Sequence, residues 1–195
     1  MTTRLGLLGG TFNPPPVGHL VLAQEARDRL GLDRVALVPV AVPPHKEAPQ
    51  DPGAELRLAL CRAAVDGADG LEVLDLEIRR DGPSYTVDTL RELHGTGDEL
   101  TFIVGGDMAL SLPSWREPEE ILRLARLGVA ERRGAARTDV EQRLAPLGAR
   151  IAFFDMPRID VSSTDIRARV ASGRPVRWLL PDAVASTIAE RGLYR

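Results

Sequence analysis

Residues 9–19 of this 195-residue chain combine glycines with a histidine at a spacing that suits phosphate chemistry. The string reads GGTFNPPPVGH, and it lies between a short apolar run and a helical pattern of alanines and leucines over residues 20–30. We therefore expect a turn from a first strand into a first helix. Gly9 and Gly10 let a ligand approach the backbone, the helix start offers unpaired N–H groups, and His19 places an imidazole beside any bound phosphate.

Two well-known phosphate-binding motifs are absent from this string. It does not contain G-x-x-x-x-G-K-[ST], and its glycines do not give G-x-G-x-x-G. For an isolated Gly18-His19 pair, a strand-to-helix turn with a surface histidine is the alternative interpretation.

A second polar cluster, with the sequence VSSTDIR, lies near the other end of the chain. Ser162 and Asp165 fit the [ST]-x-x-[DE] pattern that caps a helix start, which is a purely structural explanation. Ser163 and Thr164 would nevertheless place hydroxyls at the positive end of that helix, and Arg167 would add a bidentate guanidinium one turn later. The cluster therefore predicts a second contact with phosphate.

The first string resembles the G-G-T-F-D-P-x-H-x-G-H signature of the nucleotidyltransferases with an [HT]-x-G-H motif, in particular the bacterial nicotinate-nucleotide adenylyltransferases. The matching positions are Gly9, Gly10, Thr11, Phe12, Pro14, Gly18 and His19. Asn13 replaces the usual Asp, and Pro16 replaces the first His, which in the family contacts ATP phosphates. The second cluster, Ser162, Ser163, Thr164 and Arg167 included, resembles the family's [IV]-S-S-T-x-[IL]-R signature, whose residues bind the triphosphate.

Two further segments resemble the parts of these enzymes that bind the mononucleotide. PVAVPPHK, which ends in His45 and Lys46, is similar to the segment that closes over this substrate, where Lys46 would face its phosphate. PSYT, which contains Ser84, Tyr85 and Thr86, is similar to the segment whose backbone N–H groups hold the nicotinate carboxylate.

Three more positions match the family individually. Trp115 matches the tryptophan that stacks on the pyridine ring, with ordinary core packing as the alternative. Gly105 and Asp107 match a G-x-D motif that contacts the nucleotide ribose. Lys46 is also the only lysine among 25 Lys and Arg residues, and a site that needs a compact ammonium would retain it, although a leftover exposed lysine is equally open.

The resemblance implies transfer of the adenylyl group of ATP to nicotinate mononucleotide, giving deamido-NAD and pyrophosphate in NAD biosynthesis. His19, Lys46 and Arg167 would be the catalytic residues, and Mg²⁺ would arrive with ATP without dedicated protein ligands. One alternative is the same chemistry on another acceptor, nicotinamide mononucleotide or phosphopantetheine. Another is a weakly active nucleotide-binding homologue, because Pro16 replaces the motif histidine.

The elements that must position these residues alternate between strand and helix. Strands are expected over residues 5–8, 34–38, 71–78, 100–104, 127–130 and 151–154. Helices are expected over residues 20–30, 54–65, 84–93, 139–144, 163–171 and 181–191, with another beginning at 118. This order predicts an α/β fold, Rossmann-like and doubly wound, with a mainly parallel sheet and helices on both faces. The polar clusters then follow strand ends at one sheet edge, where such folds bind ligands.

Composition limits the remaining possibilities. A hydrophobic content of 44% without a Pro/Gly/Ser-rich linker predicts a single domain over residues 1–195. The net charge of −3, with both signs mixed along the chain, argues against a nucleic-acid partner. Without an apolar leader or an 18-residue apolar run, we expect a cytoplasmic protein with no membrane partner. Cys61 is the only cysteine, so a disulfide frame is excluded, and the sequence allows a homo-oligomer.

Overall fold

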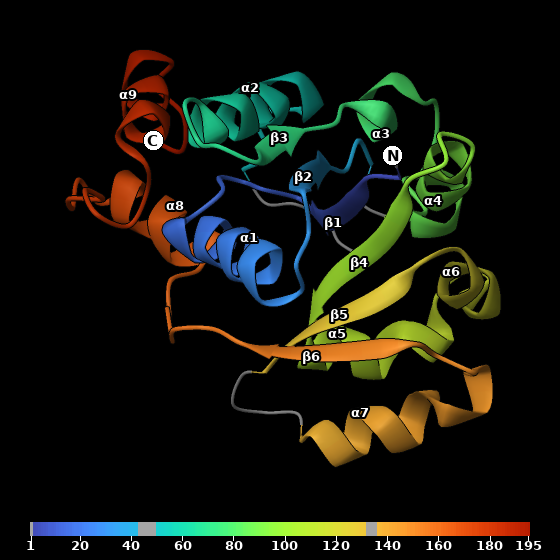
Figure 1. Cartoon of the computed structure of the whole chain (residues 1–195). Helices are drawn as coiled ribbons and strands as arrows, with labels where there is room; N and C mark the ends of the chain where they lie inside the picture. Colours follow the sequence, from blue (N-terminus) through green and yellow to red (C-terminus); the bar gives the residue numbers. More distant parts are fainter. Residues whose placement is uncertain (1, 43–49, 132–135) are drawn as a thin grey trace.

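A six-stranded parallel sheet forms the centre of the protein in the computed structural model, which describes residues 2–42, 50–131 and 136–195 (Figure 1). The strand order is β3-β2-β1-β4-β5-β6. The chain builds outward from β1 through β2 to β3, and then returns to the other side of β1 with β4. The strand order therefore reverses between β1 and β4, and a crevice opens at the carboxyl ends of the strands at such a point.

The bounds of the elements agree with most of the sequence-based expectations. The strands are β1 (Arg4–Gly10), β2 (Arg34–Pro39), β3 (Leu71–Val73), β4 (Glu99–Gly105), β5 (Arg126–Glu131) and β6 (Ile151–Asp155). The α-helices are α1 (Val17–Arg29), α2 (Ala54–Val65), α3 (Leu76–Arg79), α4 (Thr86–His94), α5 (Gly106–Ser111), α6 (Pro118–Leu124), α7 (Arg137–Leu144), α8 (Ser163–Ala171) and α9 (Asp182–Glu190). Two short 3₁₀ helices, η1 (Leu112–Ser114) and η2 (Ala145–Leu147), complete the described part of the chain.

Apolar side chains on both faces of the sheet explain why helices cover it on both sides. In β2, Val35 and Leu37 pack toward α1 and α2, whereas Ala36 and Val38 pack toward the layer of α4, α6 and α7. A strand buried on both faces is an almost continuous hydrophobic run, as the sequence of β2 is. The predicted doubly wound, Rossmann-like α/β fold is thus confirmed, and every strand pair in it is parallel.

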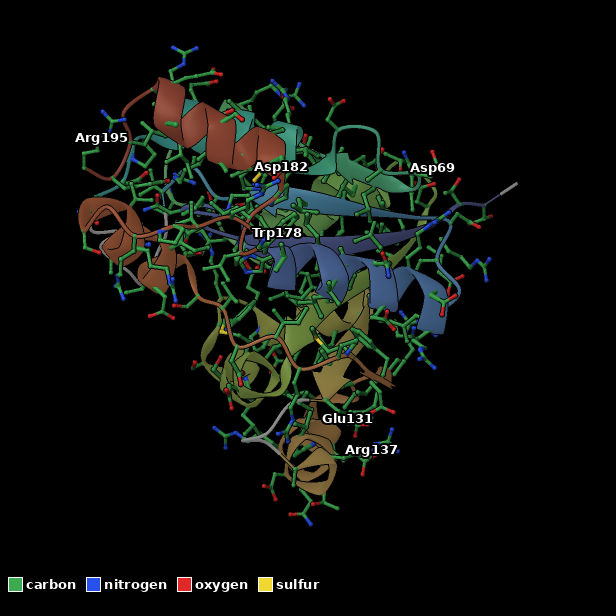
Figure 2. All side chains as sticks on the ribbon, turned by 90° about the vertical axis from the view of Figure 1, so that its left-hand side faces the viewer. Asp69, Glu131, Arg137, Trp178, Asp182 and Arg195 are labelled. Atoms are coloured by element: carbon green, nitrogen blue, oxygen red, sulfur yellow. The ribbon has the colours of Figure 1, made fainter. Side chains whose placement is uncertain are left out.

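The C-terminal helices α8 and α9 extend the layer formed by α1 and α2 (Figure 1). Residues of α2, α8 and α9 share a third apolar cluster, which includes Leu60, Ile166 and Ile188. Figure 2 views the molecule from this end and shows Trp178 at the surface, where 73% of it is exposed. The same view shows Glu131 and Arg137, which form an ion pair at 3.2 Å, at the bottom of the molecule.

Cys61 lies in α2 on the face that packs against the sheet, and it is fully buried. Loss of solvation raises the pKa of this thiol to about 12, because an apolar environment disfavours the thiolate. Cys61 is a free cysteine, and the folded protein keeps it as a small core residue.

The strand expected over residues 71–78 is wrong in its second half. β3 ends at Val73, and residues 76–79 form the short helix α3. Val73 and Leu74 are consecutive apolar residues, which breaks the alternation of a half-buried strand. β3 is also an edge strand that pairs only with β2. The last bond between them runs from the Leu74 N–H to the Leu37 carbonyl, at 3.0 Å. Beyond it no strand of the described residues holds the chain, which turns into α3. This turn directs Glu77 inward.

No helix within residues 2–42, 50–131 and 136–195 has the length and apolarity that crossing a membrane would require.

Candidate active site

A cavity of about 710 Å³ opens at the carboxyl ends of β1, β2 and β4. Its wall contains most of the residues that the sequence predicted for ligand binding. They are Gly9, Gly10, Thr11, His19, Ser84, Tyr85, Thr86, Gly105, Asp107 and Trp115. Segments that lie more than 100 residues apart in sequence are therefore brought to one sheet edge, as the strand order requires.

The imidazole of His19 is oriented by an aromatic neighbour. Phe12 is buried, and its ring meets the His19 ring edge to face, with centroids 5.1 Å apart and planes at 80°. Phe12 adopts a positive φ of 50°, so the chain turns sharply and sends this ring into the core. A Cβ atom at Gly10 would lie 3.0 Å from the same ring, which explains the glycine. The side chain of Phe12 thus supports the site from beneath.

Helix α1 begins directly after Pro16, which occupies the N-cap with a φ of −76°. Proline fits there because this position needs no intrahelical N–H. The Val17 N–H is satisfied by the carbonyl of Leu179, at 3.0 Å, and Gly18 is buried against Ile159. His19, half-buried, projects from the first turn into the cavity.

The cluster at the start of α8 holds the loop after β1 from outside the cavity. Ser162 accepts a hydrogen bond from the Asp165 N–H at 3.0 Å, so the predicted helix cap is confirmed. Ser163 donates to the Pro14 carbonyl at 2.7 Å. Arg167, which is buried, donates to the Asn13 carbonyl at 2.8 Å and to the Thr164 hydroxyl at 3.3 Å.

Asn13 is held from a second side by the C-terminal segment. The hydroxyl of Tyr194 donates to Asn13 Oδ1 at 2.7 Å. Burial of Tyr194 raises the pKa of its phenol, so this group stays a hydrogen-bond donor at neutral pH. An amide oxygen accepts this bond as a carboxylate would, and Asn13 therefore fits a position where the signature that the chain resembles has Asp.

The PSYT segment is tied to the loop after β2. The Ser84 N–H donates to the Val42 carbonyl at 3.1 Å, and the Ala41 N–H donates to the Ser84 hydroxyl at 2.9 Å. Tyr85 is then the N-cap of α4 and Thr86 its first residue, which confirms the predicted helix start. The unpaired N–H groups of a helix start therefore lie in the cavity wall.

Aromatic and cationic groups form the wall next to this helix start. The Trp115 indole donates to the Ser111 hydroxyl at 3.1 Å and meets Phe102 edge to face at 5.9 Å. It is half-buried, so it contacts the core and also lines the cavity. Arg116, which the sequence analysis did not single out, places its guanidinium 4.6 Å from the centre of the Tyr85 ring.

Glu77 is a further cavity residue that sequence reasoning missed, because it was assigned to a strand. It is only 6% exposed, and its Oε1 accepts a hydrogen bond from the Thr89 hydroxyl at 2.7 Å. Burial raises the pKa of this carboxyl, while the hydroxyls of Thr89 and Ser84 and the charge of Arg80 partly oppose the rise. A buried acid next to a helix start is a signal that only the folded chain reveals.

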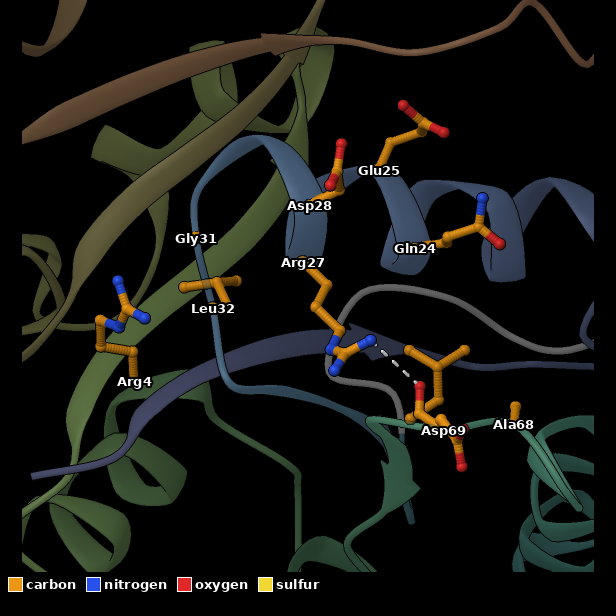
Figure 3. Close-up of a pocket in the computed structure, with 10 residues that line it drawn as sticks. Arg4, Gln24, Glu25, Arg27, Asp28, Gly31, Leu32, Ala68 and Asp69 are labelled. Atoms are coloured by element: carbon orange, nitrogen blue, oxygen red, sulfur yellow. Dashed lines mark hydrogen bonds between the residues drawn. The ribbon is translucent and has the colours of Figure 1, made fainter. Parts of the chain in front are cut away.

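Two predicted residues, His45 and Lys46, lie outside the described residues. A second hollow of about 700 Å³ lies at the opposite edge of the sheet, beside the last turns of α1 (Figure 3). Arg27 spans it and donates to the Asp69 carbonyl at 3.3 Å. None of the predicted site residues that the structure describes lines this hollow.

Comparison with known proteins agrees with this geometry. The model of the cytidylyltransferase-like family matches residues 7–169. The chain belongs to the cytidylyltransferase-like family. Within it, the chain is 45% identical to a protein from Roseiflexus sp. and 42% identical to one from Exiguobacterium sibiricum, with 98% of each chain covered. Both are named probable nicotinate-nucleotide adenylyltransferase, which confirms the resemblance drawn from the motifs.

Solved structures share the cytidylyltransferase-like fold of this chain. Two structures of Plasmodium falciparum nicotinic acid mononucleotide adenylyltransferase, complexed with APC and with NaAD, give TM-scores of 0.78 and 0.80. Each alignment covers 98% of this chain and 97% of the other, at 15% identity. At that identity the likeness concerns the fold alone.

Proposed function

We propose that this chain transfers the adenylyl group of ATP to nicotinate mononucleotide, forming deamido-NAD and pyrophosphate. One observation carries the proposal: a single cavity joins a glycine loop with His19, the start of α4 and the indole of Trp115. The reaction needs one wall for phosphates and another for a carboxylated aromatic ring, close enough for the two substrates to meet. The names of the two relatives support the same activity.

In this reaction the mononucleotide phosphate is the nucleophile. One of its oxygens bonds to the α-phosphorus of ATP, and the bond from that phosphorus to the departing pyrophosphate breaks in line. The protein contributes position and charge. His19 donates a hydrogen bond to the developing charge, and Lys46 supplies positive charge. Arg167 adds positive charge from behind the loop that follows β1, where it is bonded to the Asn13 carbonyl. The backbone of Gly9 to Thr11, with Gly105 and Asp107, holds the nucleotide.

The acceptor is bound at the other wall of the cavity. The N–H groups at the start of α4 receive the nicotinate carboxylate, because a helix N-terminus carries partial positive charge. Trp115 stacks on the pyridine ring, with Tyr85 beside it. His45 and Lys46 belong to the segment that covers the mononucleotide.

Mg²⁺ is proposed to arrive bound to ATP. Magnesium keeps several waters and needs only one or two carboxylates besides phosphate oxygens. Within the described part of the chain, no group of three or more His, Cys, Asp or Glu is placed to hold a metal ion. An ion held by triphosphate oxygens and water would neutralise phosphate charge during the transfer.

The test is an assay of pyrophosphate release from purified protein with ATP and Mg²⁺. Nicotinate mononucleotide, nicotinamide mononucleotide and phosphopantetheine are compared as acceptors, and the product is identified by mass. Deamido-NAD as the main product is the expected result. Release with another acceptor alone, or ATP binding without release, would contradict the proposal.

A further inference from the structure

Arg57 lies near the start of α2, in sequence outside every motif that the sequence analysis singled out, and its side chain is fully buried. A buried guanidinium is costly unless it is paired and hydrogen-bonded. Its Nε donates to the carboxylate of Asp51 at 2.9 Å, which supplies the opposite charge. The N–H groups of Nη1 and Nη2 therefore remain available for hydrogen bonds to other groups.

Those donors bind carbonyl groups of two different loops. Nη1 of Arg57 donates to the Thr11 carbonyl at 3.1 Å and to the Val40 carbonyl at 2.6 Å. Nη2 donates to the Ala41 carbonyl at 2.9 Å. Thr11 follows β1 and Val40 follows β2, and both line the cavity. One nitrogen atom thus joins the loop proposed for ATP to the loop that leads toward the mononucleotide.

The bonds continue from these loops to the start of α4. A peptide unit is planar, so a fixed carbonyl also fixes the N–H of the next residue. The Val40 carbonyl thereby orients the Ala41 N–H, which donates to the Ser84 hydroxyl at 2.9 Å. The Thr11 carbonyl likewise orients the Phe12 N–H. Three walls of the cavity are therefore connected through one side chain.

We propose that Arg57 is a positioning residue that sets the distance between the ATP-binding loop and the mononucleotide-binding segments. The proposal rests on the proposed function, and it gives Arg57 no contact with either substrate. Lysine cannot replace arginine in this role, because one ammonium lacks the planar fork that reaches Asp51 and three carbonyls together. A misplacement of about 1 Å at a distance from the chemistry can cost about 10²-fold in rate.

The experiment compares Arg57→Lys and Arg57→Gln with the parent protein in steady-state kinetics. Each protein is assayed well below its own melting temperature, with KM measured separately for ATP and nicotinate mononucleotide. We expect kcat to fall by about 10²-fold and both KM values to rise, with Lys no better than Gln. Arg62→Lys is the matched control, because Arg62 lies in the same helix and pairs with Asp75 at the surface, at 3.2 Å. It should stay within about twofold of the parent.

A second variant separates positioning from stability. Asp51→Asn removes the ion pair but keeps all three carbonyl bonds, so it should melt at a lower temperature with nearly unchanged kcat. A loss of turnover equal to that of Arg57→Lys would assign the effect to the ion pair and overturn the proposal. Folded Arg57 variants with parental kcat and KM, a KM change for one substrate only, or failure of both variants to fold would also overturn it. Inactivity of the parent with nicotinate mononucleotide would contradict the proposed function instead.

Discussion

At the scale of single residues, His19 combines a place in the cavity wall with a ring fixed by Phe12. A donor held in advance costs no reorganisation when charge develops on the α-phosphate. Removing one such donor in comparable sites lowers kcat by about 10²–10³. His19→Ala should therefore lose turnover to this extent, while its melting temperature changes little because the side chain is only half-buried.

His94→Ala is the matched control for this measurement. His94 is the exposed last residue of α4, so its loss should leave kcat unchanged. Near-normal turnover of His19→Ala in the same steady-state assay would remove His19 from the mechanism.

At Pro16 the chain departs from the signature that it resembles, and a proline ring cannot donate the hydrogen bond to phosphate that the signature histidine provides. A charge-assisted hydrogen bond is worth about 1.5–3 kcal/mol, or about 10- to 150-fold in rate when it acts only in the transition state. Pro16→His should therefore raise kcat/KM for ATP. The N-cap dihedral angles, φ −76° and ψ 165°, are accessible to any residue.

Pro16→Ala separates the new donor from the loss of the ring. Both variants lack the constraint of proline, but only histidine can donate to phosphate. Equal kcat/KM values for the two variants in a side-by-side assay would show that another group already provides this contact.

Glu77 should leave a signature in the pH dependence of stability. Its pKa is raised in the folded state, so the neutral carboxyl favours folding below the ordinary glutamate pKa. That contribution is lost as the pH rises through the higher folded-state value. Glu77→Gln stays neutral and keeps an acceptor for Thr89. Its free energy of unfolding relative to the parent should therefore increase from about pH 4 upward and then level off.

Urea unfolding of both proteins between pH 4 and 9 measures this difference. Glu119→Gln, at an exposed position in α6, is the surface control. A flat difference for Glu77→Gln would mean that the Glu77 carboxyl titrates alike in the folded and unfolded chain.

At the scale of elements, the start of α4 should decide between the acid and the amide. Tyr85 and Thr86 present this helix end to the cavity, and an anion gains about 0.3–1 kcal/mol there, and more when partly buried. The amide NH₂ cannot accept hydrogen bonds from helix N–H groups, so it loses those contacts as well. We expect a higher kcat/KM for nicotinate mononucleotide than for nicotinamide mononucleotide. Equal values would contradict this role of α4.

The elements themselves could be predicted where one signal dominated. The bounds expected for α2 and α8 match the structure, because α2 has an apolar stripe ended by a glycine and α8 has a serine cap. The strand expected over residues 71–78 is too long, because the alternation that favours a strand breaks at Val73 and Leu74 and leaves residues 74–78 open to strand or helix. Edge strands have only one neighbour to settle that choice.

At the scale of the whole molecule, the clustering of motifs at one sheet edge followed from chain order alone. The residues that support the motifs could not be predicted in this way, because their contacts join distant parts of the sequence. Arg57 meets Thr11 across 46 positions, and Tyr194 meets Asn13 across 181. A surface arginine and a buried one look alike in a sequence in which arginine is nearly the only basic residue. The proposed roles of Lys46 and Arg167 stay predictions.

The rate at which a thiol reagent modifies Cys61 should report on opening of the core. A thiol reagent reacts with the thiolate, and the buried group has a pKa of about 12, so labelling must await opening of the chain. Ellman's reagent should modify the native protein far more slowly than the urea-unfolded protein. Rapid, complete labelling under native conditions would contradict this expectation.

The same slow labelling measures binding without any catalysis. A ligand present at about 100 times its Kd lowers the open fraction about 100-fold, and labelling should slow by the same factor. ATP and each candidate acceptor can thus be ranked by their affinity even in variants that no longer turn over. Because Cys61 lies in α2 against the sheet, its labelling rate gives the ligand affinity of inactive site mutants as well.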